Sequence, residues 1–188
     1  MTLQPAVFLD RDGTLIEDVG FLWRHDQIRL FPWTIDAIRL LNRAGFAAVV
    51  ITNQSVVARG MATEDFVRET HAILDERLAA GGARIDRYYF CPHHPHAKVQ
   101  QYQQACTCRK PAPGMIEAAA ADLSLDLARS WMIGDGERDV EAGVAAGTRG
   151  ILLQPDRRVE APTRVGADAI LNNLMEAVGW ILRSSTSR

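Results

Sequence analysis

The chain has 188 residues, which is the usual length of one domain and enough to bury a substantial core. Its composition, 47% hydrophobic and 23% charged, is that of a globular protein, and a formal net charge of −2 disfavours a broad nucleic-acid surface. No apolar run approaches the roughly 20 residues of a membrane span and the N-terminus has no signal-peptide pattern, so we expect a cytoplasmic protein without a membrane partner.

Apolar strand patterns alternate with amphipathic helix patterns along the chain. The spacing of Ile35, Ile38 and Leu41 predicts one helix, and Thr63 followed by two acids predicts the start of another. In chain order the expected elements are a strand over 6–9, a helix over 35–44, a strand over 46–51, a helix over 63–80, a strand over 84–90, a helix from 113, a strand over 131–133, a helix to 146, a strand over 149–153 and a helix over 173–182. Residues 91–112 and 154–167 are expected to be loops, and 184–188 a frayed tail.

This alternation predicts an α/β fold, a Rossmann-like parallel sheet with helices on both faces, in a single domain over 1–188. No apolar helix face is obviously left over, so we expect a monomer. Sites in such sheets gather beyond the carboxyl ends of the strands. The side chains expected at these ends are Asp10, Thr52, Asn53, Cys91 and Asp135.

The most specific motif is the apolar strand followed by D-R-D-G-T-L at 10–15. A polar turn is the alternative, since Asp-Gly is a common turn pair. In the functional interpretation, Asp10 attacks phosphorus and forms an aspartyl-phosphate. Asp12 then protonates the leaving oxygen and later deprotonates water, while Gly13 lets the backbone approach the phosphate.

An anionic nucleophile that attacks a phosphate needs its charge offset, which Mg²⁺ held by carboxylates would do. Asp135, in the string MIGDGERD, is the expected further ligand, with a helix N-cap as the alternative. Asp139 is expected to support the loop or to orient a metal ligand.

Four further residues are candidates for binding phosphate groups. Thr52 and Asn53 offer a hydroxyl and an amide, with a turn or cap as the alternative. Lys110 offers a compact cation and Arg109 a forked donor suited to a second anionic group, whereas a solvated Arg-Lys pair is the alternative.

All three cysteines, Cys91, Cys106 and Cys108, lie in one short stretch with several histidines. Three thiolates and one imidazole form a tetrahedral Zn²⁺ set with no open position, so the predicted zinc is structural. It would pin the loop 91–110, which ends at Lys110. Idle thiols or a redox pair of Cys106 and Cys108 are the alternatives, and the residues alone leave His93, His94 and His96 open as the fourth ligand.

The order D-x-D-G-T, T-N, K-P and G-D-x-x-x-D resembles the haloacid dehalogenase superfamily of phosphohydrolases over essentially the whole chain. The resemblance implies that Asp10 is the nucleophile and Asp12 the general acid and base. It also implies that Thr52 and Lys110 bind phosphate. It implies further that Mg²⁺ would be bound by the side chains of Asp10 and Asp135 and by the backbone carbonyl of Asp12.

Within that superfamily, FLDRDGTL, TNQS, CPHHP and CTCRKPAPGM look like the capless D,D-heptose 1,7-bisphosphate phosphatases, which prepare heptose for lipopolysaccharide. This resemblance favours His93 as zinc ligand and implies that Arg109 contacts the second phosphate of a sugar bisphosphate. The chain departs from the pattern of these phosphatases on the substrate side. Gly136 stands where they commonly have a lysine, and the residues at Phe21 to Trp23, Val56 and Trp33 also differ from the usual ones. The alternative functions are a histidinol-phosphate phosphatase or other small phosphomonoesterase, and an inactive zinc-stabilised protein that binds a phosphate ligand.

Overall fold

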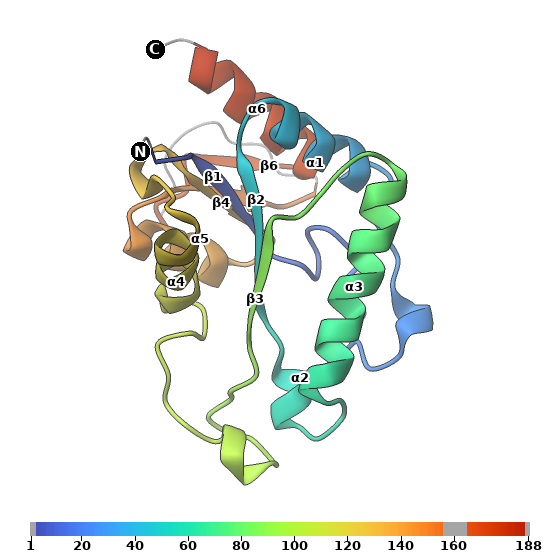
Figure 1. Cartoon of the computed structure of the whole chain (residues 1–188). Helices are drawn as coiled ribbons and strands as arrows, with labels where there is room; N and C mark the ends of the chain where they lie inside the picture. Colours follow the sequence, from blue (N-terminus) through green and yellow to red (C-terminus); the bar gives the residue numbers. More distant parts are fainter. Residues whose placement is uncertain (1–2, 156–164, 187–188) are drawn as a thin grey trace.

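The computed structural model describes residues 3–155 and 165–186, which contain a six-stranded parallel sheet with helices on both faces (Figure 1). The strands are β1 (Ala6–Leu9), β2 (Ala47–Asn53), β3 (Arg87–Cys91), β4 (Trp131–Gly134), β5 (Arg149–Leu153) and β6 (Ala169–Leu171). The α-helices are α1 (Thr34–Arg43), α2 (Ser55–Ala58), α3 (Glu64–Ala80), α4 (Gly114–Leu123), α5 (Glu137–Ala146) and α6 (Leu174–Thr186). Short 3-10 helices lie at His25–Gln27, Gln100–Tyr102 and Leu127–Arg129. The predicted α/β fold is confirmed.

The strand order β3-β2-β1-β4-β5-β6 places β1 in the middle of the sheet. From β1 the chain builds outward first through β2 and β3, then through β4, β5 and β6. Leu9 is in register with Val50 of β2 and with Ile133 of β4. Asp10 therefore leaves the sheet at the point where the strand order reverses, which is where ligands bind in open α/β sheets.

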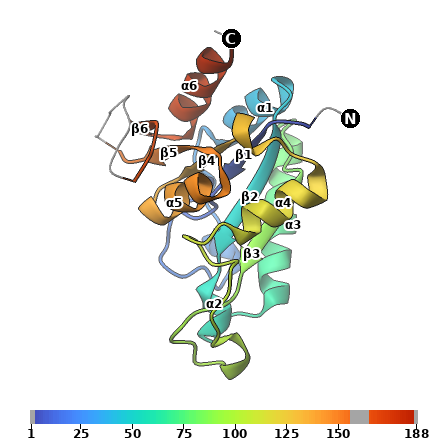
Figure 2. The ribbon, with the colours of Figure 1, turned by 90° about the vertical axis from the view of Figure 1, so that its left-hand side faces the viewer.

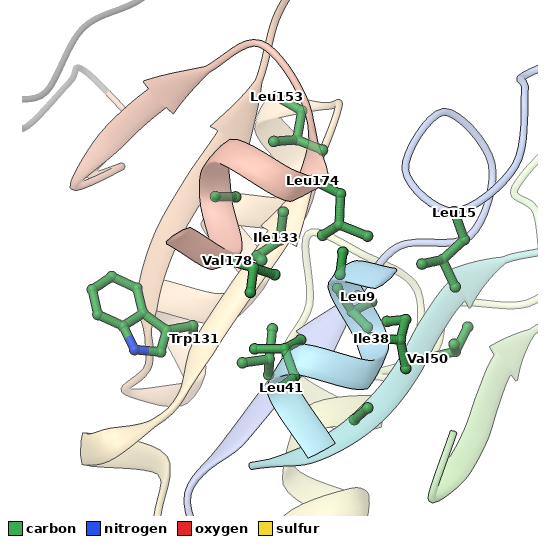
Figure 3. Close-up of a cluster of buried hydrophobic side chains, with 14 of the residues drawn as sticks. Leu9, Leu15, Ile38, Leu41, Val50, Trp131, Ile133, Leu153, Leu174 and Val178 are labelled. Carbon is green, nitrogen blue, oxygen red and sulfur yellow. The ribbon is translucent and has the colours of Figure 1, made fainter. Parts of the chain in front are cut away.

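Alternate residues of the strands pack against the two helical layers, which Figure 2 shows on either side of the sheet. On one face, side chains of α1 and α6 pack against the strand residues that include Leu9, Val50 and Ile133 (Figure 3), and side chains of α3 belong to the same cluster. On the other face, α4 and α5 pack against a set that includes Phe8 and Met132. The central strands are buried on both faces, as a parallel sheet requires.

Local chemistry explains where several elements begin and end. The Thr63 hydroxyl accepts a hydrogen bond from the backbone N–H of Phe66 at 3.1 Å, which confirms the predicted N-cap of α3. The expectation that a strand begins at residue 84 is wrong, because the Arg84 N–H donates to the Asn42 side chain and β3 begins only at Arg87.

At the C-terminus, the expected frayed tail is wrong over 184–186. Helix α6 continues to Thr186, and the Ser184 hydroxyl donates to the Trp180 carbonyl at 2.9 Å. Two short elements were not predicted, β6 with three residues and α2 with four. Residues 156–164 of the expected loop and 187–188 of the expected tail lie outside the described residues. Within the described ranges, no helix is both long and apolar enough to cross a bilayer.

Candidate active site

The rim formed by the carboxyl ends of β1, β2 and β4 holds the residues that the sequence singled out. A cavity of about 180 Å³ opens there. Its walls include Asp10, Asp12, Thr52, Asn53, Arg109 and Lys110. Segments that follow β1 and β2, among them Phe21 and Val56, complete the walls. Of the side chains predicted to converge, Asp10, Thr52 and Asn53 line this cavity. Asp135 joins Asp10 in a group of carboxylates, whereas Cys91 belongs to the separate cysteine cluster.

Lys110 is the cation at the base of this cavity, and it is almost completely buried. Its Nζ lies 2.6 Å from Asp10 Oδ1, 2.8 Å from Asp139 Oδ1 and 2.7 Å from the Ile51 carbonyl oxygen. Asp10 Oδ1 and the Ile51 carbonyl oxygen accept hydrogen bonds from the ammonium group, and Asp139 forms an ion pair with it. Burial alone would lower the pKa of Lys110, but the carboxylates of Asp10 and Asp139 outweigh it, and the net effect is a raised pKa.

The nucleophile candidate Asp10 is buried among one positive and two negative side chains. Burial is the largest effect and raises the pKa of Asp10 to about 7, while Lys110 opposes the shift and the charges of Asp139 and Asp12 add to it. A group that neutralises the surplus negative charge would restore the carboxylate form. The carboxylates of Asp10, Asp12 and Asp139 have only Arg11 and Lys110 as ion-pair partners among the described residues, and Asp135 has none. Counted over these four carboxylates and two paired cations, the formal surplus is two negative charges.

Three of these carboxylates form a candidate metal centre. One oxygen from each of Asp10, Asp135 and Asp139 lies within 4.8 Å of the others. Asp135 Oδ1 is buried and has no hydrogen-bond partner among the residues that the structure describes, and burial raises the pKa of Asp135 to about 6. A cation bound there would satisfy this orphaned oxygen, so the residues present fit Mg²⁺.

Gly13 is required by the geometry of this centre. Its φ of +80° lies in the left-handed region, and an added Cβ would lie 2.1 Å from Asp135 Oδ2. The Asp135 side chain is not a helix cap, which was the alternative for it. Instead the Asp139 carboxylate accepts a hydrogen bond from the Gly136 N–H at 2.9 Å and thereby caps the start of α5.

Asp12 is not part of the carboxylate trio, and two residues that sequence reasoning missed hold its side chain. Arg11 is buried and donates to both Asp12 oxygens, with Nη2 3.0 Å from Oδ2. Gln54 is also buried and donates from Nε2 to Asp12 Oδ2 at 2.9 Å. The signal for Arg11 was its place between two acids, and the signal for Gln54 was its place directly after Thr52 and Asn53.

Thr52 and Asn53 differ in how they meet the cavity. The Asn53 side chain is engaged with the backbone of Lys110: Oδ1 accepts from its N–H and Nδ2 donates to its carbonyl, each at 3.1 Å. One amide hydrogen of Asn53 therefore remains for a ligand. Thr52 Oγ1 accepts a hydrogen bond from Gln54 and is nearly inaccessible to solvent.

Arginine side chains are found around the cavity as well. Arg109 and Arg138 line it, and Arg109 Nη1 donates to the His93 carbonyl at 3.1 Å. Burial lowers the pKa of Arg109, and the positive charges of Arg138 and Arg59 act in the same direction. Arg59 packs over the Phe21 ring with its guanidinium carbon 4.8 Å from the centroid. In the described part of the chain neither Arg59 nor Arg138 forms an ion pair.

The cysteine loop gathers the predicted zinc residues into one cluster. Ligand atoms of Cys91, His93, Cys106 and Cys108 all lie within 4.8 Å of one another. His93 Nδ1 faces the sulfurs, 3.3 Å from Cys108 Sγ, while its Nε2 lies 2.6 Å from the Gln104 side-chain amide. His94 and His96 are not part of this cluster, so the geometry favours His93 among the three histidines. The cluster is compatible with a zinc-binding site.

Comparisons with known proteins agree with this geometry. Residues 107–177 match the model of the HAD-hydrolase-like family. The chain is 42% identical over 174 residues to D-glycero-beta-D-manno-heptose-1,7-bisphosphate 7-phosphatase of Yersinia pestis, covering 92% of each chain. It is 46% identical over 151 residues to the Rhodopseudomonas palustris protein of that name, covering 80% of this chain and 84% of the relative.

A solved structure of a protein with the same kind of name also matches this chain in fold. The D,D-heptose 1,7-bisphosphate phosphatase of B. bronchiseptica, complexed with magnesium and phosphate, superposes with a TM-score of 0.81 at 28% identity. The match covers 96% of this chain and 99% of that one. With its parallel sheet, its rim of carboxylates and its cysteine cluster, the chain belongs to the heptose-1,7-bisphosphate phosphatase family of HAD-like hydrolases.

Proposed function

We propose that this chain, as a single phosphatase domain, hydrolyses the 7-phosphate of D-glycero-D-manno-heptose 1,7-bisphosphate and releases the heptose 1-phosphate. The observation that carries the proposal is the buried contact between Asp10 and Lys110 at the reversal point of the sheet, 2.6 Å between Oδ1 and Nζ. That contact orients one carboxylate oxygen and leaves Oδ2, which receives no hydrogen bond from the described residues, as the attacking atom.

The reaction then proceeds in two displacements. In the first, an Asp10 oxygen bonds to phosphorus while the bond from phosphorus to the sugar oxygen breaks, and Asp12 gives its proton to that oxygen. In the second, Asp12 takes a proton from water as the water oxygen bonds to phosphorus, and Asp10 and phosphate are released. The side chain of Asp12 is 24% exposed, so it can reach both substrate and water.

Asp10 and Asp135 would hold Mg²⁺, with the Asp12 backbone carbonyl as a third protein ligand. When bound, the ion would offset the negative charge of nucleophile and phosphate. Asp139 lies within reach of the same position, but its contacts with Lys110 and Gly136 support a role in orienting the lysine. Thr52, Asn53 and Lys110 would bind the oxygens of the reacting phosphate.

Zn²⁺ would be held by Cys91, His93, Cys106 and Cys108. Burial raises the pKa of the Cys91 thiol, and a bound cation would favour its thiolate. The contact of Gln104 with Nε2 of His93 supports Nδ1 as the ligand atom. A zinc ion here would fix the loop two residues before Lys110.

The second phosphate of the substrate would bind among the arginines. Arg109 is the expected forked ligand, and Arg138 brings another positive charge to the same cavity. Arg138 thereby supplies charge near Gly136, where the family resemblance implied a lysine.

The experiment is a panel of heptose 1,7-bisphosphate, fructose 1,6-bisphosphate and histidinol phosphate, ranked by kcat/KM with Mg²⁺ present. We expect heptose 1,7-bisphosphate to rank first. A higher kcat/KM for histidinol phosphate would overturn the substrate assignment, and no hydrolysis of any ester would overturn the enzyme.

A further inference from the structure

Gln54 lines the cavity, and its side chain makes three hydrogen bonds to residues of the site. Its Oε1 accepts from Arg11 Nη2 at 2.8 Å. Its Nε2 donates to Asp12 Oδ2 at 2.9 Å and to Thr52 Oγ1 at 2.7 Å. The side chain is 3% exposed, and its own backbone N–H is fixed by the Cys91 carbonyl at 2.8 Å. Every polar position of this amide but one oxygen lone pair is therefore in use.

The partners determine which way the amide faces. A guanidinium has only donors, so the atom of Gln54 that meets Arg11 is the oxygen. The nitrogen must then face the Asp12 carboxylate, which as an anion only accepts. The hydrogen-bond chemistry thus excludes the flipped amide, because flipping would place donor against donor and acceptor against acceptor.

This orientation has a consequence for Thr52. Its hydroxyl oxygen accepts the second amide hydrogen of Gln54, and no other hydrogen bond to this hydroxyl is found among the described residues. The hydroxyl hydrogen is consequently free to be donated elsewhere. Thr52 lines the same cavity as Asp10, so that hydrogen is available to an oxygen of the reacting phosphate.

The same amide also restrains Asp12. Oδ2 of Asp12 receives bonds from Arg11 and Gln54, whereas Oδ1 receives a single bond, from Arg11 Nη2 at 3.1 Å. Oδ1 is therefore the less restrained oxygen and the one free to exchange a proton with the leaving group. Rotation of the carboxylate would break the bond to Gln54.

We propose that Gln54 is a positioning residue that sets two catalytic groups at once, the hydrogen of the Thr52 hydroxyl toward phosphate and the Asp12 carboxylate toward the leaving oxygen. The inference rests on the proposed function, since it assigns Gln54 to the same reaction. Gln54 itself is not required to touch the substrate.

The informative variant is Gln54→Glu, which keeps the size of the side chain and the oxygen that faces Arg11. It replaces the amide donor by an acceptor, so the Thr52 hydroxyl would donate to the new carboxylate instead of phosphate, and Asp12 would face a like charge. Gln54→Met removes the polar atoms without reversing them. Gln4→Glu is the matched control, because Gln4 is an exposed glutamine that bonds the Gly45 carbonyl away from the cavity.

Two readouts separate positioning from general damage. With Mg²⁺ present, affinity for inorganic phosphate should fall about tenfold in Gln54→Glu and less in Gln54→Met, as expected for one hydrogen bond to an anion. The value of kcat/KM reports steps up to formation of the aspartyl-phosphate. The leaving alkoxide of heptose 1,7-bisphosphate needs a proton, whereas the leaving group of 4-nitrophenyl phosphate does not. In the Gln54 variants, kcat/KM for the bisphosphate should therefore fall about a hundredfold more than kcat/KM for 4-nitrophenyl phosphate.

Equal losses for the two esters in both Gln54 variants, or unchanged phosphate affinity in Gln54→Glu, would overturn the inference. If Gln54→Glu does not fold, Gln54→Met still carries the comparison between esters. A wild-type chain that hydrolyses neither ester would overturn the proposed function, whereas the order of phosphate affinities would still decide whether Gln54 orients Thr52.

Discussion

Asn53 binds the main chain of Lys110 through both ends of its side-chain amide, accepting from the N–H and donating to the carbonyl at 3.1 Å each. This pair joins the end of β2 to the end of the cysteine loop. Because it fixes the backbone of Lys110, it also fixes where the ammonium group meets Asp10. The position of the buried cation thus depends on Asn53 as well as on the loop before it.

The first prediction concerns this pair. Asn53→Ala removes both bonds, and we expect kcat/KM to fall at least tenfold and stability to fall by about 1–2 kcal/mol. Asn42→Ala is a matched control, because Asn42 makes the same two-bond contact with the backbone of Arg84, 2.9 and 3.2 Å, far from the cavity. The control should lose similar stability and keep kcat/KM. Equal activity in the two variants would show that Asn53 is only structural.

The second prediction concerns the arginines. Arg109→Lys keeps the charge but loses the fork, and Arg138→Ala removes one charge. In both variants we expect KM for the bisphosphate to rise about tenfold, with much less change for a substrate that has one phosphate. Arg43→Ala, at an exposed arginine in the last turn of α1, should change neither. An equal rise in KM on both substrates would show that these arginines do not bind the second phosphate.

The third prediction concerns the zinc cluster. Metal analysis should find about one zinc per chain, and the double change Cys106→Ser and Cys108→Ser should abolish it. We expect that variant to lose several degrees in Tm and most of its kcat/KM, because the loop before Lys110 would no longer be fixed. Zinc bound by the double variant at the wild-type level would contradict the ligand set.

The fourth prediction is a pH dependence of stability that comes from His71. This side chain is buried and stacks on Tyr88, with ring centroids 4.4 Å apart. Burial, with a smaller contribution from the Arg11 charge, lowers its pKa from 6.5 to about 3. Between these values the unfolded chain binds a proton that the folded chain does not. Stability from this group is therefore present above pH 6.5 and lost as pH falls toward 3, by up to about 1.4 kcal/mol per pH unit.

The test is urea unfolding from pH 7 to pH 4 for the wild type and His71→Phe. Phenylalanine keeps a ring against Tyr88 and cannot titrate, so the variant should lose less stability on acidification. His96→Phe, at an exposed histidine, should keep the wild-type slope. Identical slopes for wild type and His71→Phe would rule out His71 as the source.

Much of this molecule could be predicted from its sequence because strong signals coincided. The strand before Asp10 is continuously apolar and the strand over 149–153 ends in three apolar residues, and each was predicted with its observed bounds. The clustering of cysteines predicted the group that the structure assembles. The parallel sheet followed from the alternation of patterns, and with it the rim on which the polar side chains meet.

The parts that could not be predicted depend on tertiary contacts. A buried Arg11 is unexpected from composition, because burial of an arginine requires partners. Its neighbour Asp12 is one, but Gln54 is 43 positions away and meets Arg11 only in the fold. Asn53 was predicted as a phosphate ligand, and its hold on the Lys110 backbone depends on residues 57 positions apart. Strand β6 is too short to leave a periodic pattern.

The central claim is that Asp10 carries the phosphoryl group. The direct measurement is peptide mapping by mass spectrometry after the enzyme is mixed with substrate and Mg²⁺ and quenched rapidly in acid. We predict one phosphoryl group on the peptide that contains Asp10, absent after substrate is consumed and absent in Asp10→Asn, which should also be inactive. Full turnover by Asp10→Asn, or turnover of the wild type with phosphate on a different side chain, would contradict the account.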